Sequence, residues 1–71
     1  MKVLLTGATG FLGFRTLEKL VLQPEVEKII ATGRTIKETH YINHPKVEYR
    51  LGDLSEKEFV YNLVRGCTHI I

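Results

Sequence analysis

Short apolar runs and one amphipathic stretch alternate over the first part of the chain. Residues 2–6 are mostly apolar and end at a glycine, which is typical of a parallel strand buried on both faces. Over residues 11–22, apolar side chains recur with helical spacing and charged ones fall on the other side, so the pattern predicts a helix closed by Pro24. Residues 28–32 are again apolar and predict a second buried strand.

The second part of the chain repeats this order after a polar connection. Residues 33–46 are polar and predict a loop with room for one helical turn. Residues 47–51 alternate between apolar and charged side chains, which is the period of a strand with one wetter face. A second helix is expected over residues 56–65 and a fourth strand over residues 68–71.

The ends of the second helix carry their own signals. Ser55 and Glu58 have the spacing of a capping box, in which each side chain accepts a hydrogen bond from an otherwise unpaired backbone N–H. Gly66 stands where a left-handed C-terminal cap is expected. The whole order of elements predicts an α/β fold with right-handed crossovers, the first part of a Rossmann doubly wound parallel sheet with strand order 3-2-1-4.

Length and composition limit what such a chain can be. Its 71 residues allow one small domain, with 44% apolar and 25% charged residues as in ordinary soluble proteins. We expect residues 1–71 to form a partial Rossmann domain, without a second domain, whose sheet is truncated in the fourth strand. Because such a cut exposes apolar faces, self-association of the chain is also expected.

Charge and cysteine content limit which partners and which cell compartment are expected. The net charge of +2 comes from scattered side chains, without the basic block that would bind nucleic acid. No stretch reaches the roughly 20 apolar residues of a membrane span. The single cysteine, Cys67, rules out an internal disulfide and fits a reducing compartment, so a cytoplasmic protein without nucleic acid or membrane partners is expected.

Three glycines lie between the first predicted strand and the first predicted helix. Gly7, Gly10 and Gly13 form the segment GATGFLG. In a dinucleotide-binding turn the first glycine allows a tight bend, the second lets the backbone approach a pyrophosphate, and the third permits close packing of helix on strand. The helix N-terminus then offers free N–H groups to the phosphates. A plain glycine turn is the alternative, and a P-loop is excluded because no Gly-Lys-Ser or Gly-Lys-Thr follows.

The segment TGATGFLG, the GR after the second strand and the GDL after the third together resemble the extended short-chain dehydrogenase/reductase family over essentially the whole chain. That family includes the NAD(P)-dependent epimerases and dehydratases of nucleotide sugars and the 3β-hydroxysteroid dehydrogenases. The resemblance implies that the pyrophosphate is contacted by the backbone of four residues, Thr9, Gly10, Phe11 and Leu12. It also implies that Asp53 and Leu54 border the adenine, although Asp53 is equally a common turn residue ahead of a helix.

The end of the second strand bears on the choice between NAD and NADP. An NAD-binding chain places a carboxylate there, about 20 residues past the glycines, whereas this chain has Gly33 and Arg34. Since a guanidinium pairs bidentately with phosphate, the sequence favours NADP over NAD. The alternative is a solvated loop arginine, for which Glu38 is a possible partner. The chain departs from the family pattern at Phe14, where a smaller or polar residue is common.

No residue is assigned a catalytic role. The family's active site uses a Tyr-x-x-x-Lys pair, in which the lysine lowers the pKa of the tyrosine. None of the three tyrosines here has a lysine four residues on. Tyr41 is expected in a loop, and burial in a strand and in a helix would explain Tyr49 and Tyr61.

Histidine and cysteine do not add a site. His40 and His44 have the i, i+4 spacing of a metal pair, but no third ligand completes it, so both are expected at the surface and no metal is expected. Packing is the expected explanation for Cys67 and His69.

Two classes of function stay open. The first is the NAD(P)-binding part of an oxidoreductase, epimerase or dehydratase that acts by hydride transfer on a sugar-nucleotide, a steroid or a similar alcohol or ketone. The second is a non-catalytic module that senses NADP or binds a protein partner, as the NmrA-like members of the broader family do. A fragment without a function of its own is a third reading. The truncated sheet leads us to expect weak cofactor binding at best.

Overall fold

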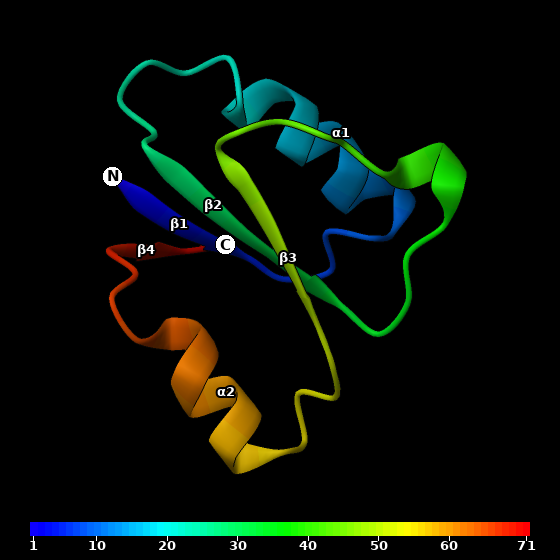
Figure 1. Cartoon of the computed structure of the whole chain (residues 1–71), viewed down its shortest axis with the longest axis vertical. Helices are drawn as coiled ribbons and strands as arrows, with labels where there is room; N and C mark the ends of the chain where they lie inside the picture. The colour runs from blue at the N-terminus through cyan, green and yellow to red at the C-terminus, as the bar shows by residue number, and fades with distance from the viewer.

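A computed structural model describes all 71 residues as a parallel sheet with a helix on each face (Figure 1). The elements in chain order are β1 (Lys2–Leu5), α1 (Phe11–Leu20), β2 (Lys28–Gly33), the single 3-10 turn η1 (Glu38–His40), β3 (Val47–Leu51), α2 (Lys57–Val64) and β4 (His69–Ile70). All strand pairs are parallel and the sheet order is β3-β2-β1-β4. The predicted α/β class and the 3-2-1-4 strand order are therefore confirmed.

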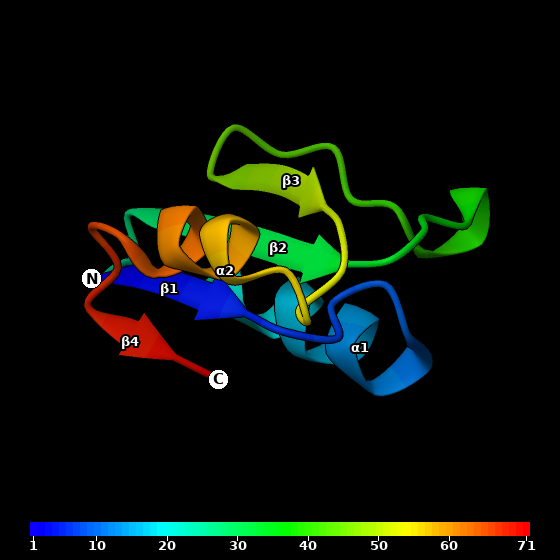
Figure 2. The same ribbon diagram turned by 90° about the horizontal axis from the view of Figure 1, so that it is seen from below.

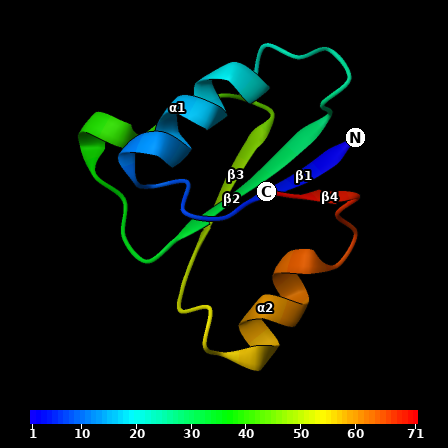
Figure 3. The same ribbon diagram turned by 180° about the vertical axis from the view of Figure 1, so that it is seen from behind.

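Both faces of the central strands are buried, as the continuous apolar runs predicted. One apolar cluster lies between the sheet and α1 and contains Val3, Leu5, Ala8, Leu17, Val26, Ile29 and Ala31. A smaller cluster on the opposite face joins Leu4 and Ile30 to Leu63 of α2. Figure 3 shows the two helices on opposite sides of the sheet. The alternation of side chains along each strand explains how β1 and β2 supply both clusters.

The four strands point the same way, and their carboxyl ends lie along one edge of the sheet (Figure 2). In a right-handed βαβ arrangement the chain leaves each strand at that edge and returns to the opposite one through a helix or a loop. The turn after β1, the bend after β2 and the bend after β3 therefore meet at the same edge. This convergence places the motifs of the sequence side by side.

The strand predictions were close and the helix ends less so. β3 has the predicted bounds, while β4 covers only His69–Ile70 of the predicted residues 68–71. Pairing nevertheless extends past the assigned strand, because the Ile71 N–H donates to Leu4 O at 2.9 Å. α1 ends at Leu20 rather than at residue 22, and the side chain of Leu22 is 77% exposed, so it does not belong to the buried stripe.

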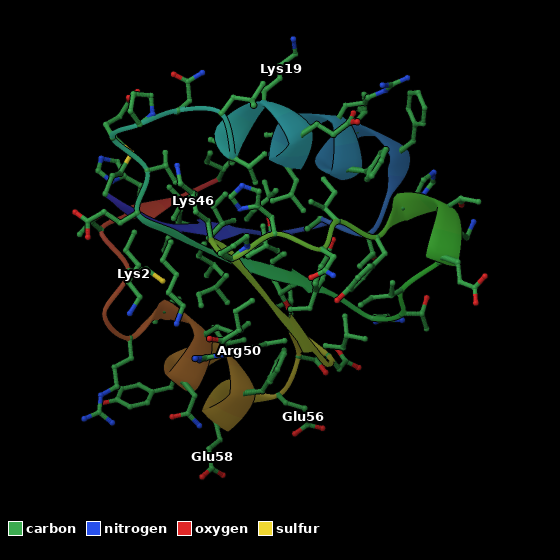
Figure 4. All side chains as sticks on the ribbon, turned by 45° about the horizontal axis from the view of Figure 1, so that its top comes forward. Lys2, Lys19, Lys46, Arg50, Glu56 and Glu58 are labelled. Atoms are coloured by element: carbon green, nitrogen blue, oxygen red, sulfur yellow. The ribbon has the colours of Figure 1, made fainter.

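The predicted capping box at the start of α2 was wrong. The helix begins at Lys57 after an N-cap at Glu56, and no side chain caps it. Ser55 belongs instead to a local turn ahead of the helix, in which its N–H donates to Asp53 Oδ1 at 2.9 Å. Glu58 is exposed and points away from the chain in Figure 4. The C-terminal prediction holds, because Gly66 follows the helix with φ of 81°.

Candidate functional site

The glycine-rich turn between β1 and α1 has the geometry expected of each glycine. Gly7 has φ of 64°, in the left-handed region that allows a tight bend. A Cβ built on Gly13 would lie 1.9 Å from the carbonyl oxygen of Gly7, so the first turn of α1 packs directly on the bend. At Gly10 a Cβ would meet only that same oxygen, at 3.6 Å, which is ordinary contact. Nothing in the protein itself therefore requires a glycine at position 10.

The same turn presents unpaired hydrogen-bond donors. The Gly10 N–H donates to Gly7 O at 3.2 Å, and the Phe14 N–H donates to Gly10 O at 2.9 Å. The N–H groups of Gly7 and of four residues around the start of α1, Thr9, Phe11, Leu12 and Gly13, donate to no backbone or side-chain acceptor in the chain. α1 has no side-chain N-cap and no acidic residue in its first turn. Free donors at the positive end of a helix dipole form a site for an anion.

A cleft of about 290 Å³ opens beside this turn, at the carboxyl edge of the sheet. Its walls come from the ends of three neighbouring strands and consist of Gly7, Thr9, Gly33, Arg34, Gly52, Asp53 and Leu54. The cleft thus brings together residues from the GATG, GR and GDL segments. Ligands of open α/β sheets bind in this position, outside the carboxyl ends of the strands.

Two of the lining residues were not among the expected site residues. Gly33 faces the Thr9 side chain, and a Cβ on Gly33 would lie 2.3 Å from Thr9 Oγ1. Gly52 faces the ring of Phe59 in α2, where a Cβ would lie 2.7 Å from the nearest ring atom. Both glycines let flanking elements approach the edge of the sheet closely. Their place in the GR and GDL segments is the sequence signal that could have identified them.

Arg34 and Asp53 meet across the cleft. The guanidinium Nη2 of Arg34 lies 3.6 Å from Asp53 Oδ1, and the Arg34 side chain is 80% exposed. Hydrogen bonds from Ser55 and the nearby charge of Arg34 lower the pKa of the Asp53 carboxyl below its ordinary value. No ion pair joins Arg34 to Glu38, the alternative partner considered from the sequence. The guanidinium is thus held at the rim by a charged group but remains open to solvent.

The expected site residues fall into two groups. Gly7, Thr9, Arg34, Asp53 and Leu54 line the cleft. The other four, Gly10, Phe11, Leu12 and Gly13, form the adjoining start of α1 and do not line it. The side chains of Phe11 and Leu12 are exposed, so only their backbone N–H groups are candidates for contact with an anion. Phe14, the departure from the family pattern, is half-buried and stacks on His40.

Several expectations for the remaining polar residues need correction. Tyr61 and His69 are exposed, so burial explains neither of them, whereas Cys67 does pack against the smaller apolar cluster. Neither His40 nor His44 is free at the surface: His40 is half-buried against Phe14, and half-buried His44 accepts a hydrogen bond at Nδ1 from the Lys46 N–H. No group of three or more His, Cys, Asp or Glu side chains is placed to hold a metal ion. Neither helix is long and apolar enough to cross a bilayer.

Comparison with known proteins agrees with this geometry. The model of an NAD-binding family described as male sterility protein matches residues 5–64, from the end of β1 to the end of α2. A search of the curated proteins found no match. The match spans the glycine-rich turn and all three segments that line the cleft. The chain therefore belongs to this family of NAD(P)-dependent reductases, and it forms an NAD(P)-binding Rossmann-like domain of the extended short-chain dehydrogenase/reductase type.

Proposed function

We propose that the chain binds NADP(H) in preference to NAD(H) at the carboxyl edge of its sheet. In this proposal it is the cofactor-binding part of a reductase that transfers hydride to or from an alcohol or ketone, such as a sugar-nucleotide or a steroid. One observation carries the cofactor preference. Arg34 presents an exposed guanidinium at the end of β2, where an NAD-binding chain would present a carboxylate.

The pyrophosphate has a natural place at the glycine-rich turn. Four unpaired N–H groups surround the start of α1, and the nearest acidic side chain along the helix, Glu18, is paired with Arg15 at 3.1 Å. A pyrophosphate would accept hydrogen bonds from these N–H groups and interact favourably with the helix dipole. Gly10 leaves room for it, because no side chain rises between the turn and the ligand.

The adenosine half of the cofactor would lie over the ends of β2 and β3. Leu54 is half exposed and offers an apolar surface to the base, while the Asp53 carboxylate can accept a hydrogen bond from an exocyclic amine. Arg34 would then reach the 2′-phosphate of the ribose, where a bidentate pair is possible. Gly33 and Gly52 line this space, and because they lack side chains Thr9 and Phe59 pack close beside it.

The cofactor supplies the hydride chemistry, and the residues of this chain hold and orient the cofactor. No residue of the chain is assigned a role in proton transfer. Tyr41 stacks on Tyr49 at 5.0 Å, and the Tyr49 hydroxyl accepts a hydrogen bond from the Ile42 N–H, so both serve the packing of the β2–β3 connection.

Calorimetric titration of the chain with NADPH and with NADH tests the proposal. We expect NADPH to bind more tightly, and Arg34→Ala to weaken NADPH binding by roughly ten- to one-hundred-fold, because a hydrogen bond to a charged group contributes about 1.5–3 kcal/mol. NADH binding should change little. Arg65→Ala removes an equal charge from an exposed position at the end of α2 and serves as the matched control. Equal loss of NADPH and NADH affinity in Arg34→Ala would contradict a role at the 2′-phosphate.

A further inference from the structure

The connection between β2 and β3 folds back onto the glycine-rich turn. Its 3-10 turn η1 ends at His40, whose ring stacks on Phe14 with centroids 5.1 Å apart and planes 27° apart. The Phe11 ring lies nearby, with its centroid 6.4 Å from that of His40 and the two planes at 63°. His40 Nδ1 lies 3.4 Å from the carbonyl oxygen of Thr9. One side chain thus contacts both the first turn of α1 and the loop that precedes it.

The contact with the Thr9 carbonyl indicates which nitrogen of the imidazole carries a proton. A carbonyl oxygen can only accept a hydrogen bond, so Nδ1 of His40 is the donor and carries a proton.

The carbonyl that His40 contacts belongs to the peptide unit at the centre of the turn. The N–H of the same unit is that of Gly10, which donates to Gly7 O at 3.2 Å. The peptide between Thr9 and Gly10 is therefore held from both sides, by His40 at its oxygen and by Gly7 at its nitrogen. The N–H groups immediately before and after it, those of Thr9 and Phe11, are two of the unpaired donors described above.

We propose that His40 is a positioning residue for the phosphate-binding turn. It holds the Thr9–Gly10 peptide in the orientation that leaves the neighbouring N–H groups free for the pyrophosphate. The inference rests on the proposed cofactor function and adds to it a residue that acts from outside the cleft, because His40 does not line it. Stacking on Phe14 seats the ring, and the Nδ1–H fixes the peptide.

Three variants separate the two contacts of the ring. His40→Ala removes both, His40→Phe keeps an aromatic ring on Phe14 but has no donor, and His40→Asn keeps an N–H near the position of Nδ1. Thr39→Ala is the matched control, since Thr39 is exposed on the same turn and its side chain makes no hydrogen bond. For each variant, NADPH affinity is measured by calorimetry, and exchange of the Gly10 amide hydrogen is measured by NMR without ligand.

We expect His40→Ala and His40→Phe to weaken NADPH binding by roughly three- to ten-fold and to speed exchange of the Gly10 amide, because one modest hydrogen bond is lost in each. His40→Asn should restore much of both. His40→Phe keeps the packing, so its thermal midpoint should stay near that of wild type. Loss of stability in His40→Phe without loss of affinity would reduce His40 to a packing residue and overturn the inference.

The two proposals fail in different ways. If wild type binds neither NADPH nor NADH, the proposed function is wrong, and the amide exchange of the unliganded chain still decides whether His40 holds the turn. If wild type binds NADPH and the His40 variants match Thr39→Ala in both affinity and Gly10 exchange, the positioning role is wrong and the cofactor site stands.

Discussion

The glycines of the turn after β1 have different structural roles, which the space around each one distinguishes. Gly13 is required by the fold, because any side chain there would enter the Gly7 carbonyl at 1.9 Å. Gly10 has ordinary space and an ordinary backbone conformation, with φ of −83°. A glycine that the protein itself does not need is best explained by what approaches it from outside. Gly13 therefore matters for the stability of the fold, and Gly10 for the binding of a ligand.

Alanine at these two positions should have opposite effects. We expect Gly13→Ala to lower the free energy of unfolding by about 1–3 kcal/mol or more, because the added methyl group displaces the first turn of α1 from the bend. Gly10→Ala should leave stability within about 0.5 kcal/mol of wild type and weaken NADPH binding instead. Urea unfolding and calorimetry on the two variants measure both effects. A Gly10→Ala protein that binds NADPH as wild type does would show that the pyrophosphate lies elsewhere.

Residue identity alone predicted part of this site. The spacing of Gly7, Gly10 and Gly13 between a strand and a helix carries the steric roles, because those roles depend on neighbours a few residues away. His40 and Thr9 are 31 positions apart in the sequence, so no local sequence pattern indicates their contact. The sequence therefore suggested a surface histidine where the structure has a ring against the turn.

At the scale of elements, ion pairs cross the outer part of the sheet. Glu48 of β3 accepts a hydrogen bond from Lys28 Nζ of β2 at 2.8 Å and another from the Arg50 Nε of its own strand. Arg50 also donates to Asn62 O at 3.3 Å, which ties β3 to α2. The hydrogen bonds from Lys28 and then Arg50 lower the pKa of Glu48 below 4.5. The β2–β3 pairing thus includes an electrostatic contribution.

The sign of the pH dependence follows from the lowered pKa of Glu48. A carboxyl whose pKa is lower in the folded state stabilises the fold fully above its unfolded value, near 4.5, and loses that contribution as the pH falls through the folded value. The side chain is 38% exposed, so solvent screening limits the contribution to less than about 1 kcal/mol.

We therefore expect Glu48→Gln to lower the free energy of unfolding slightly at about pH 7, and the difference from wild type to shrink as the pH falls towards about 3. Urea unfolding at a series of pH values measures this. Glu25→Gln is the control, because Glu25 is exposed, lies outside the helices and strands, and its carboxylate makes no ion pair. A difference that grows on acidification would contradict the assignment.

The start of α2 gives a second test at this scale. Because Ser55 does not cap the helix, we expect Ser55→Ala to change the free energy of unfolding by less than about 0.5 kcal/mol, whereas loss of a genuine N-cap costs about 1 kcal/mol. Chemical unfolding followed by circular dichroism measures the difference. A loss of about 1 kcal/mol or more would mean that the capping box forms in solution.

Strands were easier to predict than helix ends for a physical reason. Residues 28–32 and 47–51 are defined by burial and by alternation, which are properties of the sheet as a whole. In a capping box the Ser55 N–H would donate to the Glu58 carboxylate. Here the same N–H donates to Asp53 Oδ1, in a turn that precedes the helix. Spacing alone cannot rank such competing hydrogen bonds.

At the scale of the whole molecule, parallel topology assembles the site. The bends after β1, β2 and β3 are far apart in sequence, and the order β3-β2-β1 places them next to one another at the carboxyl edge. The sequence predicted this order and the motifs at each bend. It did not predict that Arg34 would be paired with Asp53 rather than Glu38, because that choice depends on the twist and spacing of two neighbouring strands.

The central claim is that a dinucleotide occupies this edge of the sheet, and an NMR titration of the ¹⁵N-labelled chain with NADPH tests it most directly. We predict saturable shifts at the amides of the glycine-rich turn and the first turn of α1, and at residues 33–34 and 52–54. Shifts from NADH should cover the same turn and be weaker near Arg34. Saturable shifts confined to other parts of the chain, or no shifts at the turn, would contradict the account.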